Sequence, residues 1–178
     1  MKSIALSSQS SPVSSLLRMF LPIVIVMLYS VDLFAQVRVA VLPVRNMDGN
    51  LGLNSYCYSL ADSLRSALAA SPGQGTTFTV VPSDSIEAVL AELNLDPTSP
   101  QYESDLWKSV ALLKCDYAVT GSFNMNAGRM LLNMYTYDVT TKLPNSIHAA
   151  TNIFKAPEKI HQMIGVIKDK LIPGFVKR

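Results

Sequence analysis

The sequence predicts an α/β fold: a single domain on a mixed sheet of about five strands with helices packed on it, preceded by an N-terminal hydrophobic helix. Short β-branched segments alternate with amphipathic ones, in the order βαβααβββα. Strand–helix–strand connections join parallel neighbours, whereas the closely spaced later strands are antiparallel neighbours. The sheet is therefore expected to be mixed.

The length and the charge distribution of the chain predict a single domain that does not bind nucleic acid. The chain has 178 residues and a formal net charge of +2, and its Lys and Arg residues are scattered. Residues 36–178 suffice for one domain with a hydrophobic core. No basic stretch has the character of a nucleic-acid footprint, so we expect no nucleic-acid partner.

The N-terminal segment, residues 1–35, has the pattern of a signal peptide. Lys2 and Arg18 are its only charges before an apolar run from Met19 to Val31. That run is short for a membrane-spanning helix, which needs about 20 apolar residues. It fits the apolar region of a secretory signal peptide, with cleavage between Ala35 and Gln36. No Cys lies at the end of the run, since Cys57 and Cys115 are far downstream, so lipid attachment is not indicated.

An uncleaved membrane anchor is the alternative for the same segment. Leu33, at position −3 of the cleavage site, is larger than the small residue preferred there. The first strand begins at Val37, without a linker, so a retained helix would hold the domain against the bilayer. In both cases Arg18, ahead of the run, favours export of the domain.

The mature chain divides into elements by periodicity. Strands are expected at Val37–Pro43, Thr76–Val81, Asp116–Phe123, Met130–Val139 and Ile147–Phe154. Apolar side chains at helical spacing predict helices around Cys57–Leu68, Ile86–Leu93, Leu106–Leu113 and Pro157–Leu171. Ser83 and Asp84 are expected to cap the second helix, with Glu87 completing a capping box.

Three segments carry a family resemblance. They are Val39-Ala40-Val41-Leu42-Pro43 with Asn46 and Gly49-Asn50, Leu60-Ala61-Asp62-Ser63-Leu64, and Asp116-Tyr117-Ala118-Val119-Thr120-Gly121-Ser122-Phe123. In that order they resemble the N-terminal domain of TolB, and also envelope modules of CsgG-like and FlgO-like proteins. The resemblance covers about Val37 to Phe154. It implies a module that contacts other envelope components, and it transfers no catalytic residue.

Gly121 and Asp116 have structural interpretations of their own. A glycine within a strand permits close approach of another backbone or a bulge. Asp116 is expected to orient the end of the preceding helix and the start of the strand.

A search for chemistry finds no catalytic, metal or cofactor site. His148 and His161 have no ligand-forming neighbours at metal-site spacing. No Gly-x-Ser-x-Gly elbow or phosphate-binding loop is present. Cys57 and Cys115 are expected at opposite ends of the sheet, and therefore as two buried free thiols rather than a disulfide.

Two places are candidates for binding. The loop Arg45 to Asn50 follows the first strand at the carboxyl edge of the sheet, where open α/β sheets bind ligands. Its candidate contact residues are Arg45, Asn46 and Asp48. Tyr135 and Tyr137 share one face of a strand, where packing under a helix is the main interpretation and stacking on a ligand the lesser one.

The sequence thus predicts a non-catalytic, exported interaction module of the periplasm or cell envelope. Its expected partners are other envelope proteins, or a second copy of itself. The alternative is a membrane-anchored accessory subunit of a larger complex, which contacts the membrane through its retained N-terminal helix.

Overall fold

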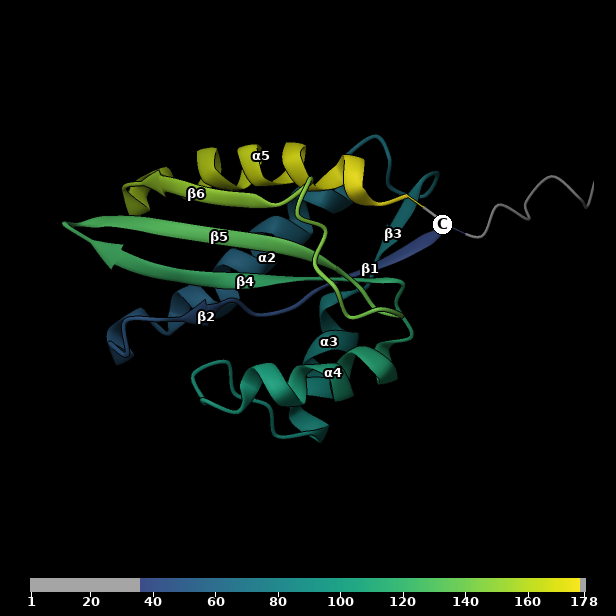
Figure 1. Ribbon diagram of the computed structural model, residues 1–178, viewed down its shortest axis with the longest axis horizontal. Helices are drawn as coiled ribbons and strands as arrows, with labels where there is room; N and C mark the ends of the chain where they lie inside the picture. The colour runs from purple at the N-terminus through teal and green to yellow at the C-terminus, as the bar shows by residue number, and fades with distance from the viewer. Residues whose placement is uncertain (1–35, 177–178) are drawn as a thin grey trace, which may run out of the picture. The chain divides into compact units, whose positions relative to one another are not determined.

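A computed structural model describes residues 36–176, which form a mixed α/β domain (Figure 1). The N-terminal hydrophobic helix that the sequence predicts within residues 1–35 lies outside the described residues. Each helix within residues 36–176 is too short or too polar to cross a bilayer. The elements are β1 Val37–Val41, β2 Arg45–Asn46, η1 Leu51–Leu53, α2 Ser55–Ala69, β3 Phe78–Val80, α3 Ser83–Glu92, α4 Tyr102–Leu113, β4 Tyr117–Asn126, β5 Arg129–Asp138, β6 Ala150–Lys155, η2 Pro157–Lys159, α5 Ile160–Leu171 and η3 Ile172–Gly174.

The sheet has the strand order β3-β1-β4-β5-β6, with β2 paired to β4. β1 lies parallel to both β3 and β4, whereas β4, β5 and β6 form an antiparallel meander. Right-handed crossovers from β1 to β3 and then from β3 back to β4 run in opposite directions across the sheet, so their helices cover opposite faces. The predicted mixed sheet and its element order are confirmed.

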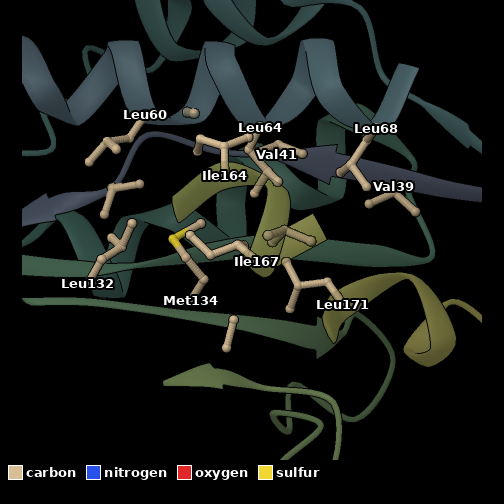
Figure 2. Packing of buried hydrophobic residues seen from close by; sticks show 14 of the residues in the cluster. Val39, Val41, Leu60, Leu64, Leu68, Leu132, Met134, Ile164, Ile167 and Leu171 are labelled. Atoms are coloured by element: carbon tan, nitrogen blue, oxygen red, sulfur yellow. The ribbon is translucent and has the colours of Figure 1, made fainter. Parts of the chain in front are cut away.

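One face of the sheet is covered by α2 and α5. Leu64 and Leu68 of α2 meet Ile167 and Leu171 of α5 over Val39 of β1, and all five are fully buried (Figure 2). This cluster continues across β4, β5 and β6 through the buried side chains Val119, Phe123, Met130, Leu132, Met134, Ala150 and Ile153. The larger hydrophobic core therefore extends under the whole meander.

The opposite face has a smaller core under α3 and α4. Its strand residues are Ala40, Leu42 and Ala118, which come from β1, the segment after it and the start of β4. On β5 the side chains alternate, so that Met134 and Thr136 are buried while Tyr135 and Tyr137 are half-buried. The half-buried side chains belong to the face that α3 and α4 only begin to cover.

β2 is a strand that the sequence did not predict. Pro43 ends β1 as expected, and the Val44 N–H then donates to the Cys57 carbonyl at 2.9 Å. The chain rejoins the sheet when Arg45 and Asn46 pair with Ser122 and Phe123 of β4. Arg45 and Asn46 therefore lie in a short strand, and only the remainder of the predicted loop is irregular.

Two other predicted details are wrong. The N-cap of α3 is Pro82 and makes no side-chain capping bond. Ser83 instead donates to Glu87 at 2.9 Å, so the capping box is absent. The last strand begins at Ala150 rather than Ile147, because the Asn145 side chain accepts the Ile147 N–H in a turn.

Asp116 performs half of its predicted role. Its carboxylate accepts the Arg38 N–H at 2.7 Å, and its own N–H donates to the Arg38 carbonyl at 2.8 Å. These bonds align the start of β4 with β1. The preceding helix ends without it, at Lys114 in a left-handed conformation with φ of 49°.

The two cysteines are free and buried, as predicted. Cys57 belongs to the core under α2 and α5, whereas Cys115 belongs to the core under α3 and α4. The sheet thus lies between the two thiols. Burial raises the pKa of Cys115 to about 11 from its ordinary value of 9.0.

Stability should therefore fall in alkaline solution. The Cys115 thiol stays neutral in the fold while the unfolded chain ionises, so its contribution is complete below pH 9.0 and declines as the pH rises towards about 11. The slope is about 1.4 kcal/mol per pH unit for this one group. Urea unfolding of Cys115→Ala at several pH values should show a shallower decline, and a decline equal to that of the parent protein would contradict the assignment.

Gly121 makes the close approach that the sequence predicted. A Cβ at this position would lie 1.9 Å from the carbonyl oxygen of Asn133 on β5. The pairing of β5 with β6 is irregular between Leu132 and Met134, beside the same residue. The contact partner is backbone, so it cannot move aside as a side chain would.

Gly121→Ala should destabilise the protein by about 2 kcal/mol or more, because overpacking forces the strands apart. Gly165→Ala is the matched control: Gly165 lies in α5 with open space around it, and alanine there should stabilise by about 0.5–1 kcal/mol. Urea unfolding followed by circular dichroism measures both. Equal stability of the two variants would refute the steric role of Gly121.

Candidate functional site

A cavity of about 630 Å³ lies between α4 and the half-covered face of the sheet. We call it the α4 cavity. Its residues come from β2, the loop before α4, α4, β4, β5 and the loop after β5. Its charged, aromatic and hydroxyl side chains include Arg45, Trp107, Ser122, Tyr135, Tyr137 and Lys142.

An aromatic cluster forms one wall of the α4 cavity. The ring of Trp107 meets Tyr137 edge to face, with centroids 5.7 Å apart, and Tyr137 lies 6.2 Å from Tyr135. The Lys142 ammonium is 5.8 Å from the centre of the Trp107 ring. Tyr137 thus packs against a helix, as predicted, while Tyr135 extends the aromatic surface beyond it.

Two hydroxyls from residues that line the cavity donate to the same backbone carbonyl. Pro43 ends β1, and its carbonyl oxygen accepts the hydroxyl of Tyr102 at 3.1 Å and that of Thr120 at 3.0 Å. Burial raises the pKa of the Tyr102 phenol far above its ordinary value, so this hydroxyl remains a donor. The two bonds join α4 to the sheet at the bottom of the cavity.

Arg45 links the cavity to the predicted contact loop. Its guanidinium forms an ion pair with Glu103 of α4 at 3.0 Å, and Glu103 is largely exposed. A surface pair of this kind contributes at most about 1 kcal/mol. Its position matters more, because both partners line the cavity and each neutralises the charge of the other there.

Asn46 and Asp48 do not reach the α4 cavity. The Asn46 amide donates to the Asn50 carbonyl at 2.9 Å and to the Asn54 side chain at 2.8 Å. The Asp48 carboxylate accepts the Met125 N–H at 2.5 Å. The Asn46 side chain therefore stabilises the loop itself, and the Asp48 side chain attaches the loop to β4. Of the three predicted contact residues only Arg45 lines the cavity.

The predicted cleavage site lies at the edge of the described residues. Ala35 is outside them, and Gln36 is the first residue within them. The Gln36 side chain accepts the Thr79 hydroxyl at 2.5 Å and donates to the Gly75 carbonyl. Cleavage between Ala35 and Gln36 remains a prediction.

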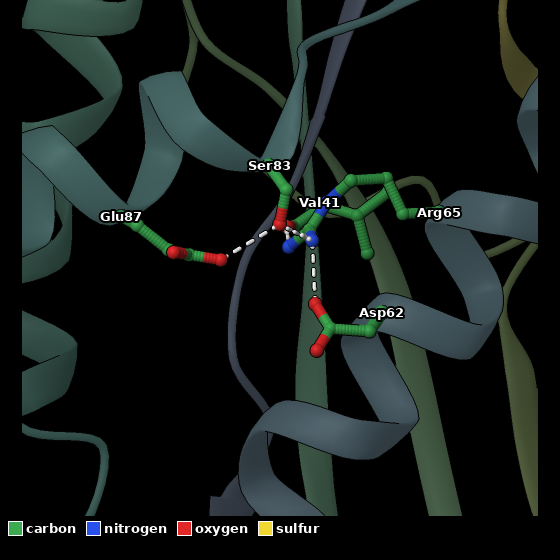
Figure 3. A network of polar contacts seen from close by, with 5 residues as sticks. All are labelled: Val41, Asp62, Arg65, Ser83 and Glu87. Carbon is green, nitrogen blue, oxygen red and sulfur yellow. Dashed lines mark hydrogen bonds and ion pairs between the residues drawn. The ribbon is translucent and has the colours of Figure 1, made fainter.

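The carboxyl end of β1 is occupied by a polar network around Arg65 (Figure 3). The Arg65 guanidinium donates to Asp62 at 2.5 Å, to the Ser83 hydroxyl at 2.7 Å and to the Val41 carbonyl at 3.0 Å. Ser83 in turn donates to Glu87. This network joins α2, β1 and α3. It lies at the carboxyl edge of the sheet, where open α/β sheets usually bind ligands.

Residues 36–176 bring together no candidate metal site. No group of three or more metal-ligating side chains comes together in that part of the chain. His161 lines a separate shallow groove between α2 and α5, far from the aromatic cluster in the sequence and on the other face of the sheet.

Sequence reasoning identified the parts of the α4 cavity without assembling them. The alternation of Tyr135 and Tyr137 and the position of Trp107 beside its helical stripe were both visible. Their meeting depends on how α4 crosses the sheet. Lys142 and Thr120 gave no signal in the sequence.

Comparisons with known proteins support the fold alone. No family model and no curated protein sequence matches the chain. The NMR structure of LpoB from Escherichia coli is 22% identical, with a TM-score of 0.50 over 75% of this chain and 64% of that chain. The LpoB C-terminal domain from Escherichia coli is 22% identical, with a TM-score of 0.46 over 72% of this chain and 90% of that one.

TolB from Acinetobacter baumannii is 16% identical, with a TM-score of 0.44 over 77% of this chain and 27% of that chain, too low a score to establish a shared fold. The resemblance to CsgG-like and FlgO-like modules remains a prediction. What the comparisons show is that this chain has a fold similar to that of LpoB.

Proposed function

We propose that this protein is an exported, non-catalytic module of the bacterial cell envelope that binds another protein through the α4 cavity and the adjoining sheet face. One observation carries the proposal: Trp107, Tyr135 and Tyr137 form an accessible aromatic cluster on a face of the sheet that the described helices leave partly open. Trp, Tyr and Arg are the residues that dominate the binding energy of protein interfaces.

The open face is defined by strand register. Tyr135 pairs with Thr120, and Asn133 with Ser122, so these residues share one side of the antiparallel pair. Further along, Leu131 lies between Asn124 of β4 and Phe154 of β6. Half-buried apolar side chains among amides and hydroxyls have the composition of an interface surface rather than of a core.

The cavity is poorly equipped for catalysis. Its one carboxylate, Glu103, pairs with Arg45, and its lining contains neither His nor Cys. Burial raises the pKa of Tyr137 above its ordinary value of 10.0, which keeps the phenol neutral. General acid–base catalysis most often uses His, and no His lines this cavity.

Export rests on the sequence of residues 1–35 and sets the location. The apolar run after Arg18 directs the domain across a membrane, and cleavage after Ala35 would release it into the periplasm. The second candidate, a membrane-anchored accessory subunit, is favoured by one observation: β1 begins at Val37, directly after the segment. If the N-terminal helix were retained, no linker would separate it from the domain, and the domain would be held close to the membrane.

A site-specific cross-linking experiment in living cells tests the function. A photoreactive phenylalanine analogue at Tyr135 should give adducts with an envelope protein, because that side chain faces the open side of the sheet. The same analogue at Lys170, an exposed position on α5, is the matched control and should give none. Equal adduct yields at both positions would contradict the proposed surface.

The mass of the protein isolated from the same cells discriminates the two candidates. A mature chain that begins at Gln36 identifies the released module, whereas an intact segment before Ala35 identifies the anchored subunit. Recovery of the protein from the cytoplasm would contradict both.

A further inference from the structure

We propose that the α4 cavity binds an acidic, proline-rich segment of a partner protein in extended conformation. The inference rests on the proposed function and adds the chemistry of the partner. It comes from the hydrogen-bonding groups, the charges and the shapes of the side chains that line the cavity.

Several polar groups that line the cavity are free to donate hydrogen bonds. The indole N–H of Trp107 and the hydroxyls of Ser122, Tyr135 and Tyr137 have no hydrogen-bond partner among residues 36–176, and Lys142 adds an ammonium group. An indole and an ammonium can only donate. The one acceptor side chain with a charge, Glu103, already holds Arg45. The complementary ligand therefore offers acceptors to the indole N–H of Trp107 and the ammonium of Lys142, while the hydroxyls can satisfy either kind of group.

The charges at the cavity and on the open face of the sheet favour an acidic ligand. Lys142 forms no ion pair within the described residues, and Arg129 farther along the open face stacks 3.9 Å from the centre of the Phe154 ring. The side chains of β4 and β5 on this face include no carboxylate: Thr120, Ser122, Asn124, Asn126, Arg129, Leu131, Asn133, Tyr135 and Tyr137. An acidic ligand would thus meet cations at the cavity and along the face that leads from it.

Proline satisfies both the apolar and the hydrogen-bonding requirement. Each proline offers a carbonyl acceptor without a backbone N–H, and its ring packs on aromatic side chains. Polyproline II segments bind aromatic-lined grooves in this way, at low entropic cost because the segment is already extended. The cavity volume of about 630 Å³ is within the range of ligand sites.

Binding can be measured with the intact mature protein and synthetic peptides. The probe is an acetylated repeat of Glu-Pro-Pro, and the matched peptides are repeats of Lys-Pro-Pro and of Glu-Gly-Ser. Trp107 is the single tryptophan of the chain, so its fluorescence reports occupancy of the cavity directly. We expect the Glu-Pro-Pro peptide to change this fluorescence saturably, with an affinity that weakens as salt is raised.

Two variants locate the binding. Lys142→Glu should weaken the Glu-Pro-Pro peptide about tenfold or more, because it reverses the charge beside Trp107. Lys170→Glu makes the same change of net charge on α5 and should leave binding unchanged. Trp107→Leu should weaken binding of the same peptide by at least about tenfold, as expected for truncation of a central aromatic residue. Because this variant lacks the fluorescent reporter, its binding is measured by calorimetry.

Three outcomes would overturn the inference: equal binding of the Lys-Pro-Pro peptide, equal effects of the Lys142 and Lys170 substitutions, or no binding of the Glu-Pro-Pro peptide. Saturable quenching by an N-acetylglucosamine tetrasaccharide without any response to the peptides would assign the cavity to a glycan instead. If the peptides fail while the Tyr135 position still cross-links to a protein, the proposed function stands and the partner chemistry falls.

Discussion

The architecture depends on one constraint: a six-stranded sheet has two faces, and the helices suffice for one face and part of the other. The crossovers around β1 place α2 on one side and α3 and α4 on the opposite side. After β4 the chain forms a meander without a crossover helix, and the closing helix α5 returns to the side of α2 (Figure 1). The other side of the meander therefore lacks a helix among the described residues.

The half-open face is adapted to water by its side chains. Along β5 the buried positions hold Met130, Leu132 and Met134, whereas the alternate positions include Asn133 and Tyr135. Tyrosine combines an apolar ring with a hydroxyl, and Arg129 covers the ring of Phe154. Such side chains tolerate solvent and still offer apolar area to a partner. The same residues thus serve the free protein and a complex.

Much of the fold follows from local patterns that the sequence displays. Three patterns predict their elements directly: the β-branched run from Val37, the helical stripe of Leu60, Leu64 and Leu68, and the closely spaced strands after Asp116. The missed features depend on tertiary contacts. β2 exists because Val44 bonds to Cys57 and returns the chain to β4. The capping box fails because Pro82, which has no side-chain acceptor, is the N-cap of α3, and the Ser83 hydroxyl donates to Glu87 instead.

The candidate site was predictable in its residues and not in its assembly. Alternation places Tyr135 and Tyr137 on one face, but only the packing of α4 brings Trp107 to them. The loop prediction succeeded for Arg45, which pairs with α4, while Asn46 and Asp48 are taken up by the hydrogen bonds of their own loop.

The central claim is that the open face is covered by a partner in the cell. Hydroxyl-radical footprinting of Trp107 in intact cell envelopes and in the purified protein tests it most directly, with Tyr58, an exposed residue of α2, as the internal reference. If a partner covers this face, oxidation of Trp107 relative to Tyr58 should fall several-fold in the envelope. An equal ratio in both samples would contradict it, because the cavity would then be as open in the cell as in solution.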